Sequence, residues 1–264
     1  MWCSGSVQLI RGRIVNRGLF LSNKFHSAIE AMKSLVKSDK AYLAHVVKSL
    51  AGVHPRECPI CGYNGKFKAF GSPPRWDAMC PSCFSLERQR LLYLAISRSF
   101  PLPAECEALH FAPEFSIQRF IKPKAKTYKT ADLMGSGVDL KLNIERIDLK
   151  DNSFDAVICC HVLEHVNDQL ALTELYRILR PSGLLYLMVP IIEGWERTYE
   201  NAAVTTDTGR NLHFGQRDHV RYFGSDLRSK IGQAGFNLKE FTAEGEDVIR
   251  YGLMRGEKVF VCSK

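Results

Sequence analysis

Two pairs of cysteines have the spacing of a metal site. They follow the pattern C-x2-C-x18-C-x2-C, with Cys58, Cys61, Cys80 and Cys83 as the ligands. A two-residue gap lets both thiolates of one turn reach the same ion, and four thiolates complete a tetrahedral shell that leaves no position for water. The spacing predicts structural zinc. A redox CxxC needs no second pair, and iron–sulfur clusters usually have another ligand spacing.

A second group of chemically capable side chains lies in residues 191–224, a segment long for a connection and therefore expected to have a function. It ends in the sequence HFGQRDHVRYF, which is rich in groups that bind sugar hydroxyls and anions. We predict His219 as a general base, oriented by Asp218 or Glu164. Arg217 and Arg221 are candidates for holding a phosphate or carboxylate. The alternative is a structural hydrogen-bond hub with surface arginines.

The elements that must position these groups fall into three segments. Residues 1–55 are a basic N-terminal segment with a helix over 25–50, stopped by Gly52 and Pro55. Residues 56–100 hold the cysteine pairs, a short hairpin and an exit helix, and resemble a zinc ribbon. From residue 101 to 264, strand-like and helix-like runs alternate, which predicts an α/β domain.

The α/β segment contains seven expected strands. They cover residues 107–111, 126–132, 139–144, 154–160, 183–189, 236–242 and 257–262. A helix begins near Asn167 or Asp168 and ends at Pro181–Gly183, and His165 is expected to cap it or to pack under it. Only about six residues separate the second and third strands, although a parallel crossover usually needs a dozen or more. The usual helix there must be missing, or the strands must pair differently.

Composition sets the broad class of the protein. The 264 residues are 45% hydrophobic, with no apolar run near the ~20 residues of a membrane span. The basic start lacks a secretory signal's uninterrupted apolar core, because Arg11, Arg13 and Arg17 break it. Of nine cysteines, Cys3, Cys106 and Cys262 are scattered and Cys159–Cys160 are adjacent in an apolar run, a pattern that suits reduced thiols. We expect a soluble cytoplasmic protein.

The sequence DNSFDAVICCHVLEHV, with LRPSG after the next helix, resembles the signature of class I S-adenosylmethionine-dependent methyltransferases of the type 11 group. The resemblance covers roughly residues 105–262. It implies a Rossmann-like sheet, S-adenosylmethionine as cofactor and methyl transfer as the reaction. More narrowly, the segments CPICG…CPSCFSLERQRLLYL, LHFAPE and FGQRDHVRYFG are similar to zinc-containing members found in bacterial glycan-biosynthesis clusters. That likeness implies O-methylation of a sugar, glycan or other small polar acceptor.

In an open α/β sheet, ligands bind outside the carboxyl ends of the strands. The turn after the first strand, Phe111-Ala112-Pro113-Glu114, is therefore expected to approach the cofactor, although it lacks the family's glycines. At the end of the second strand Asp132 is the candidate for the ribose hydroxyls, with Asp139 in reserve.

The remaining cofactor contacts follow the third and fourth strands. Asn143–Ile144 stands where relatives hold the adenine ring, commonly with an Asp in place of the Asn. His161 follows the fourth strand, near the expected methionine end of the cofactor. A structural histidine is the alternative for His161.

Two other functions remain open. Residues 1–57 hold nine Lys and Arg against three Asp and Glu, so an RNA methyltransferase could use this basic arm and the zinc module to bind nucleic acid. The arm, which can also touch other anionic surfaces, lacks the aromatic interleaving of a single-strand binding platform. A non-catalytic protein with the same fold would explain the glycine-poor first turn.

Overall fold

The computed structural model describes residues 33, 37 and 39–264, which fall into a unit ending at Leu50 and a second unit from Ala51 to Lys264. Residues 39–50 form a helix, which confirms this part of the prediction for 25–50. Among the rest of that range only Lys33 and Lys37 are described, and both are helical. Cys3, Arg11, Arg13 and Arg17 lie outside the described residues.

The cysteine-paired segment folds as two antiparallel hairpins followed by a helix. The strands are β1 (Pro55–Glu57) with β2 (Asn64–Lys66), and β3 (Lys68–Phe70) with β4 (Arg75–Met79). Helix α2 (Glu87–Leu94) continues into a π-helical turn, η1 (Ala95–Ser99). The chain enters the module through Gly52, whose φ of +102° and missing side chain leave room for the carbonyl of Phe67. The hairpin and the exit helix are confirmed.

Seven strands form one mixed sheet in the order β12-β13-β9-β8-β5-β6-β7. Strands β7, β6, β5, β8 and β9 are parallel, whereas β13 is antiparallel to both of its neighbours. Their bounds are β5 (Glu107–Phe111), β6 (Thr127–Asp132), β7 (Leu140–Lys141), β8 (Phe154–Cys160), β9 (Leu179–Met188), β12 (Asn237–Thr242) and β13 (Lys258–Ser263). The predicted α/β class is confirmed.

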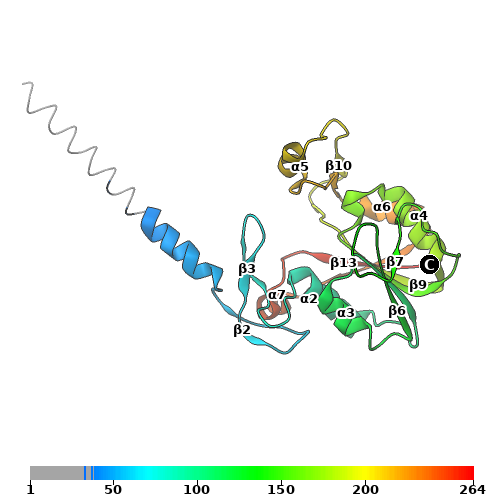
Figure 1. The fold of residues 1–264 in the computed structure, drawn as a ribbon, viewed down its shortest axis with the longest axis horizontal. Helices are drawn as coiled ribbons and strands as arrows, with labels where there is room; N and C mark the ends of the chain where they lie inside the picture. The colour runs from blue at the N-terminus through cyan, green and yellow to red at the C-terminus, as the bar shows by residue number, and fades with distance from the viewer. Residues whose placement is uncertain (1–32, 34–36, 38) are drawn as a thin grey trace, which may run out of the picture. The chain divides into compact units, whose positions relative to one another are not determined.

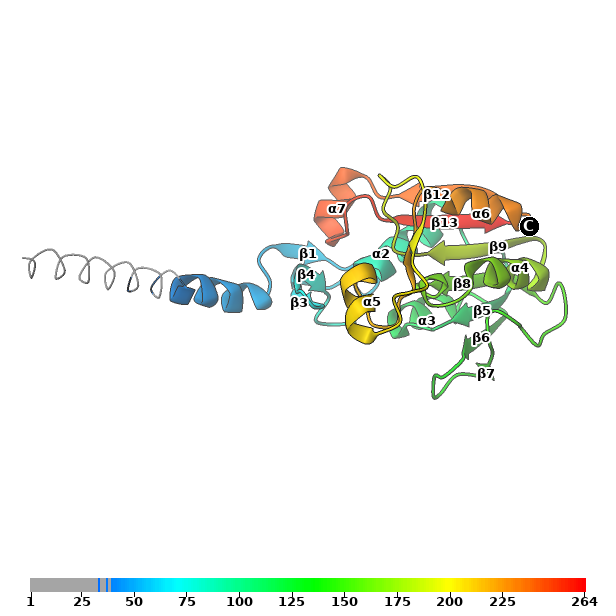
Figure 2. The same cartoon turned by 90° about the horizontal axis from the view of Figure 1, so that it is seen from above.

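Helices cover both faces of this sheet (Figures 1 and 2). Helices α4 (Asp168–Ile178) and α6 (Leu227–Gln233) pack on one face. Helices α2, α3 (Phe115–Ile121) and α7 (Gly245–Tyr251) pack on the other. Successive strand residues point to opposite faces, so β8 places Val157 and Cys159 in the first core and Ile158 in the second. Burial on both faces explains the continuously apolar sequence of the central strands.

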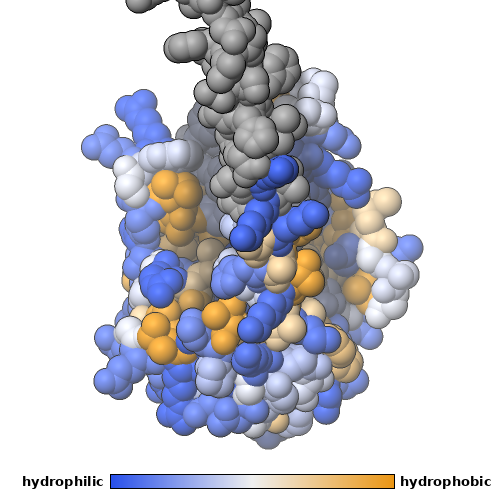
Figure 3. Space-filling model, turned by 90° about the vertical axis from the view of Figure 1, so that its left-hand side faces the viewer, coloured by the Kyte–Doolittle hydropathy of each residue, from blue (hydrophilic) through white to orange (hydrophobic). Residues whose placement is uncertain are grey.

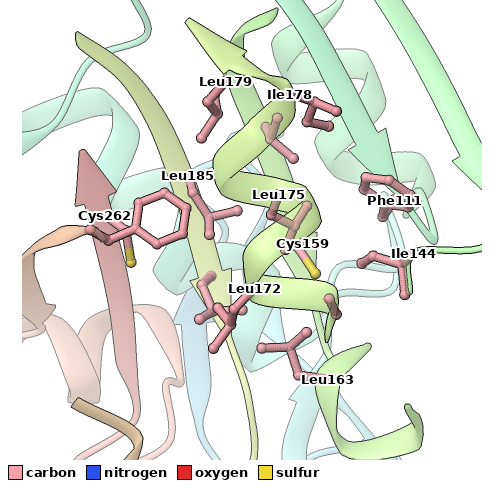
Figure 4. Close-up of a cluster of buried hydrophobic side chains, with 14 of the residues drawn as sticks. Phe111, Ile144, Cys159, Leu163, Leu172, Leu175, Ile178, Leu179, Leu185 and Cys262 are labelled. Carbon is pink, nitrogen blue, oxygen red and sulfur yellow. The ribbon is translucent and has the colours of Figure 1, made fainter. Parts of the chain in front are cut away.

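The core under α4 reaches the carboxyl ends of the strands. Figure 4 shows Leu172 and Leu175 of α4 among side chains from β8 and β9, with Phe111 and Ile144 close to each other beside them. Asn167 caps the helix, because its side chain accepts a hydrogen bond from the amide of Leu170. This core fixes the edge of the sheet from which the site residues project.

Two expectations about element bounds need correction. The strand expected over 139–144 is only Leu140–Lys141, because Asn143 accepts a hydrogen bond from the amide of Glu145 and turns the chain. The helix expected to reach Pro181 ends at Ile178, because a proline disfavours helical geometry in the residue before it. The expectation that the usual crossover helix between the second and third strands is missing is confirmed, because no helix lies between β6 and β7 and the two strands are parallel.

The segment 191–224 has secondary structure of its own. Strand β10 (Tyr199–Glu200) pairs antiparallel with β11 (Arg221–Tyr222), and α5 (Asp207–Phe214) lies between them. Figure 1 shows α5 and β10 standing apart from the main sheet. The segment is therefore a folded insertion after β9.

On the face in Figure 3, apolar side chains form separate patches between polar ones. The eight cysteines of the described range form no disulfide. Within the same range, no helix combines the length and the apolar character that a membrane crossing requires.

Candidate active site and metal centre

The register of the parallel strands brings the predicted cofactor contacts to one edge. Phe111 at the end of β5 lies opposite Ala131 of β6 and Cys159 of β8. The residues that follow β5 and β8, Ala112 and His161, both have left-handed backbones with φ of +46° and +55°. Such geometry is uncommon outside glycine and clusters at functional sites. The chain therefore turns sharply at both strand ends, as a cofactor-binding edge requires.

The first turn carries a partly buried carboxylate, Glu114, whose partners His110 and Arg88 the sequence did not predict. Glu114 lies 3.3 Å from the Nε2 of His110 and 3.6 Å from the Nε of Arg88 in α2. Burial opposes ionisation of Glu114, but the hydrogen bond with His110 and the positive charge of Arg88 outweigh it and lower the pKa of the carboxyl. Pro113 precedes it, and Glu114 stands at the N-terminus of α3. Helix α2 thus brings Arg88 to the edge of the sheet.

The two aspartates proposed for the ribose have different surroundings. One oxygen of Asp132 accepts hydrogen bonds from the amides of Met134 and Gly135. One oxygen of Asp139 accepts from both the amide and the hydroxyl of Thr130, and these bonds lower its pKa. Asp139 therefore ties the β6–β7 loop to β6, whereas Asp132 stands at the strand end.

The adenine candidates, Asn143 and Ile144, lie at the same edge as Phe111 of the first turn. Phe111 and Ile144 are buried in the core under α4 (Figure 4), so only their main chains can face a ligand. The side-chain oxygen of Asn143 is held by the amide of Glu145. The side-chain nitrogen of Asn143 has no hydrogen bond within the described residues.

A histidine–carboxylate pair, in which only the carboxylate is fully buried, follows β8. Its members, His161 and Glu164, lie on either side of the turn that leads to η2 (Leu163–His165), and the Nδ1 of His161 is 3.2 Å from the Oε1 of Glu164. Glu164 is fully buried. Its Oε2 and the Nε2 of His161 are also buried, and neither has a hydrogen-bond partner among the described residues. Buried polar atoms without partners are rare, and each calls for an explanation.

The predicted base lies next to this pair. The rings of His219 and His165 are 4.7 Å apart. The Nδ1 of His219 lies 3.1 Å from the carbonyl of Phe214, so this carbonyl, and neither carboxylate, orients the ring. Burial lowers the pKa of His219 and favours its neutral form.

Asp218 contacts the other histidine of this edge. The Nδ1 of His165 is 3.2 Å from the carbonyl of Asp218 and 3.5 Å from its Oδ2. The prediction that His165 caps α4 is wrong, because Asn167 is the cap and His165 contacts the insertion.

Arg221 ties the insertion to the turn after β8. It is buried, and it donates hydrogen bonds to the carbonyls of Leu163 and Val166 and to Glu200. The amide of Val220 adds a bond to the carbonyl of Glu164 at 2.9 Å. The alternative that Arg221 is a surface charge is wrong, because its side chain is buried and donates to these internal acceptors. Arg217 is exposed.

The four cysteines of the paired motif come together as the spacing predicted. One sulfur from each lies within 4.8 Å of the others, and the Sγ atoms of Cys58 and Cys83 are 3.5 Å apart, those of Cys61 and Cys80 3.7 Å. Thiolates at 2.3 Å from a shared tetrahedral ion are about 3.8 Å apart. Burial raises the pKa of the Cys58 and Cys80 thiols, so a bound cation is needed to keep them ionised. These residues fit zinc.

A buried arginine that sequence reasoning missed links this module to the sheet domain. Arg90 of α2 has no exposed surface. It donates hydrogen bonds to the carbonyls of Ala78 and Ser85 in the cysteine module, and to those of Tyr251 and Gly252 at the end of α7. The signal available in the sequence was a charged residue directly before the apolar run Leu91–Leu94 of the exit helix.

Comparison with known proteins agrees with this architecture. Residues 117–187, from α3 to β9, match the family model Methyltransf_11, described as a methyltransferase domain. The chain contains an S-adenosylmethionine-dependent methyltransferase domain. The predicted fold class and enzyme class are therefore confirmed, and with them S-adenosylmethionine as cofactor. Zinc in the cysteine cluster stays a prediction.

Solved structures and one curated protein are also similar to parts of the chain. An S-adenosylmethionine-dependent methyltransferase from Mesorhizobium loti is 14% identical, with a TM-score of 0.49 over 66% of this chain and 98% of that one. One from Archaeoglobus fulgidus is 14% identical, with a TM-score of 0.44 over 67% and 94%. A 47-residue stretch is 51% identical to the uncharacterized protein MJ0638 of Methanocaldococcus jannaschii. It covers 18% of this chain and 21% of that protein, so the match spans about a fifth of that relative's length.

Proposed function

We propose that the whole chain transfers the methyl group of S-adenosylmethionine to an oxygen of a sugar, glycan or other small polar acceptor. The observation that carries this proposal is one edge of the sheet. There Asp132 ends β6 and His161 follows β8, and His219 of the insertion lies beside Glu164. The acidic and imidazole groups gathered there suit hydroxyl recognition. The narrower likeness to proteins of glycan-biosynthesis clusters agrees with it.

The cofactor would lie across the ends of β5, β6 and β8. The main chain of Phe111, Ala112 and Pro113 would approach it, with Glu114 at the start of α3. Asp132, through the carboxylate oxygen that Met134 and Gly135 do not use, would accept from the ribose hydroxyls. The main chain at Asn143–Ile144 would contact the adenine ring.

His161 would complete this binding edge from the fourth strand. Its Nε2 has no partner among the described residues. We place it near the methionine end of the cofactor, where it can donate a hydrogen bond.

Bound S-adenosylmethionine supplies an activated methyl group on a sulfonium. The chain then has to align the acceptor oxygen with the methyl carbon and exclude water. An alcohol must also lose its proton as it attacks. We assign this task to the cluster of His219, Asp218 and Glu164, with His219 nearest the acceptor. The acceptor oxygen gains the methyl group, the sulfur keeps the electrons of the broken C–S bond, and the proton passes to the base or solvent.

The zinc module has a structural role in this proposal. Cys58, Cys61, Cys80 and Cys83 would hold zinc, with no ligand position left for substrate. Through Arg90 and α2, the folded module would fix the position of Arg88 beside Glu114. The ion held by the four cysteines would therefore act on catalysis only by holding this framework.

The proposal is tested with methyl-labelled S-adenosylmethionine. The full-length protein is incubated with panels of sugars, nucleotide sugars and glycans, and the products are analysed by mass spectrometry. Label on a hydroxyl oxygen of such an acceptor is the expected result. Label only on RNA supplied in parallel, or calorimetry that detects no binding of S-adenosylmethionine, would refute it.

A further inference from the structure

Three side chains at the active-site edge come together as a set of metal ligands. Glu164, His165 and His219 each offer one ligand atom, and these atoms lie within 4.8 Å of one another. They belong to two segments, η2 after β8 and the loop after α5, that Val220 and Arg221 tie together. The cluster is separate from the four cysteines.

Both imidazole rings are held in the way that metal-binding histidines usually are. The Nδ1 of His165 contacts the carbonyl of Asp218 at 3.2 Å, and the Nδ1 of His219 contacts the carbonyl of Phe214 at 3.1 Å. A carbonyl at Nδ1 fixes the proton on that nitrogen and leaves Nε2 as the basic atom. Each ring therefore has one nitrogen available for an ion.

The carboxylate lacks the partner that an ion would supply. Glu164 has no exposed surface, and only its Oε1 has a contact, with His161. Its Oε2 is buried without a hydrogen-bond partner in the part of the chain that the structure describes. A buried acceptor in this state has lost its hydrogen bonds to water without replacement, which destabilises the fold, and more so when the group is charged. A cation between Glu164 and the two rings would remove this cost.

We propose that Glu164, His165 and His219 bind a divalent transition-metal ion, such as zinc, manganese or iron. Two imidazoles and one carboxylate suit these ions better than magnesium or calcium, which prefer oxygen ligands alone. Three protein ligands leave a coordination position open, which is the arrangement of catalytic sites. The cysteine site has four ligands and no open position.

The role of this ion rests on the proposed function, although its binding does not. An acceptor hydroxyl in the open position would have its pKa lowered by the ion, as metal-bound water does. The hydroxyl proton would leave to solvent, and the oxygen would take the methyl group while the C–S bond breaks. His219 would then act on the acceptor through the ion instead of taking the proton itself.

The experiment counts zinc bound per chain. The full-length protein is brought to equilibrium with zinc alone by dialysis, and bound metal is measured by elemental analysis. We expect two ions in the wild type, but one in His165→Ala and one in His219→Ala. His213→Ala is the matched control, because this histidine lies in the same insertion and contacts Tyr199 instead; it should keep two. A wild type that binds one ion, or histidine variants that still bind two, would overturn the proposal.

Cobalt spectra exclude misfolding as the cause of a lost ion. Co²⁺ in the cysteine site has strong sulfur-to-metal charge-transfer absorption, which a site of two imidazoles and a carboxylate lacks. His165→Ala and His219→Ala should keep these bands, because the cysteine site still binds Co²⁺. They should lose only the second Co²⁺ ion per chain, whose affinity should fall at least tenfold. Loss of the bands together with the second equivalent would attribute the effect to unfolding and contradict the site.

The metal and methyl-transfer measurements fail separately. Two bound ions without methyl transfer to any hydroxyl would remove the proposed function and leave the metal site in place. One bound ion together with hydroxyl methylation would remove the metal site and leave the proposed function in place.

Discussion

The cysteine module and the strand edge each gather metal-ligand side chains, but they are built differently. In the module, four thiols come from two short turns between Cys58 and Cys83. At the edge, His165 meets Asp218, 53 positions further along the chain, and this meeting depends on Arg221. The first cluster is closed and local. The second is assembled from distant segments, and within the described residues it leaves the Oε2 of Glu164 without a hydrogen-bond partner. We therefore assign a structural role to the four-cysteine cluster and a role in the reaction to the cluster at the strand edge.

Breaking the closed cluster should have the largest effect. Cys80→Ser removes one of four thiolates, and because zinc binding in such small units is worth on the order of 10 kcal/mol, the module should lose zinc and unfold. Zinc analysis and thermal unfolding measure this. Cys106→Ser, a buried cysteine outside the cluster, should retain the metal. An unchanged zinc content in Cys80→Ser would show that the cluster is not the site.

The link between the module and the sheet should have the next largest effect. Arg90→Met leaves carbonyls of both parts without their buried donor, so unfolding should become about 3–5 kcal/mol easier. Urea denaturation measures the difference. Arg98→Met removes a partly exposed ion pair with Asp247 and should cost at most about 1 kcal/mol. Equal losses in the two variants would argue against a special role for Arg90.

At the open cluster, activity should fall while stability changes little. His219→Ala should lower turnover about 10²–10⁴-fold and leave the affinity for S-adenosylmethionine unchanged, since the ring lies outside the cofactor contacts. Steady-state kinetics and calorimetry measure the two quantities. His213→Ala serves again as control and should keep its turnover. Unchanged turnover in His219→Ala would discard this residue as the group nearest the acceptor.

The smallest expected effect is the difference in S-adenosylmethionine affinity between variants of the two aspartates near the end of β6. Asp132→Ala should weaken S-adenosylmethionine binding roughly tenfold through the lost ribose contact. Asp139→Ala removes the bonds to Thr130 and should lower stability more than affinity. Calorimetry on both variants, with thermal unfolding beside it, gives the answer. The opposite ranking of affinities would move the ribose site to Asp139.

The sequence was most informative where structure follows from local pattern. The thiol spacing placed all four cysteines, and continuous apolar runs placed β8 with its exact bounds and β9 within a few residues. The short β6–β7 crossover was also recognised from chain length. Each of these features depends on neighbours in the sequence, so composition and spacing suffice to find it.

Contacts between distant segments were the ones that sequence reasoning missed. Nothing near His165 indicated that it would face His219, or that Arg221 would be buried under η2. Arg90 has the same character, because its four carbonyl partners come from three parts of the chain. Such contacts are set by how the insertion and α7 pack, which no local pattern encodes.

A crystal structure of the full chain with S-adenosylhomocysteine tests most directly whether the ends of β5, β6 and β8 hold the cofactor. The ribose should lie against Asp132 and the sulfur near His161, with the cluster of Glu164, His165 and His219 open toward the sulfur. A ligand bound elsewhere, or side chains filling the space beyond these strand ends, would contradict the proposed site.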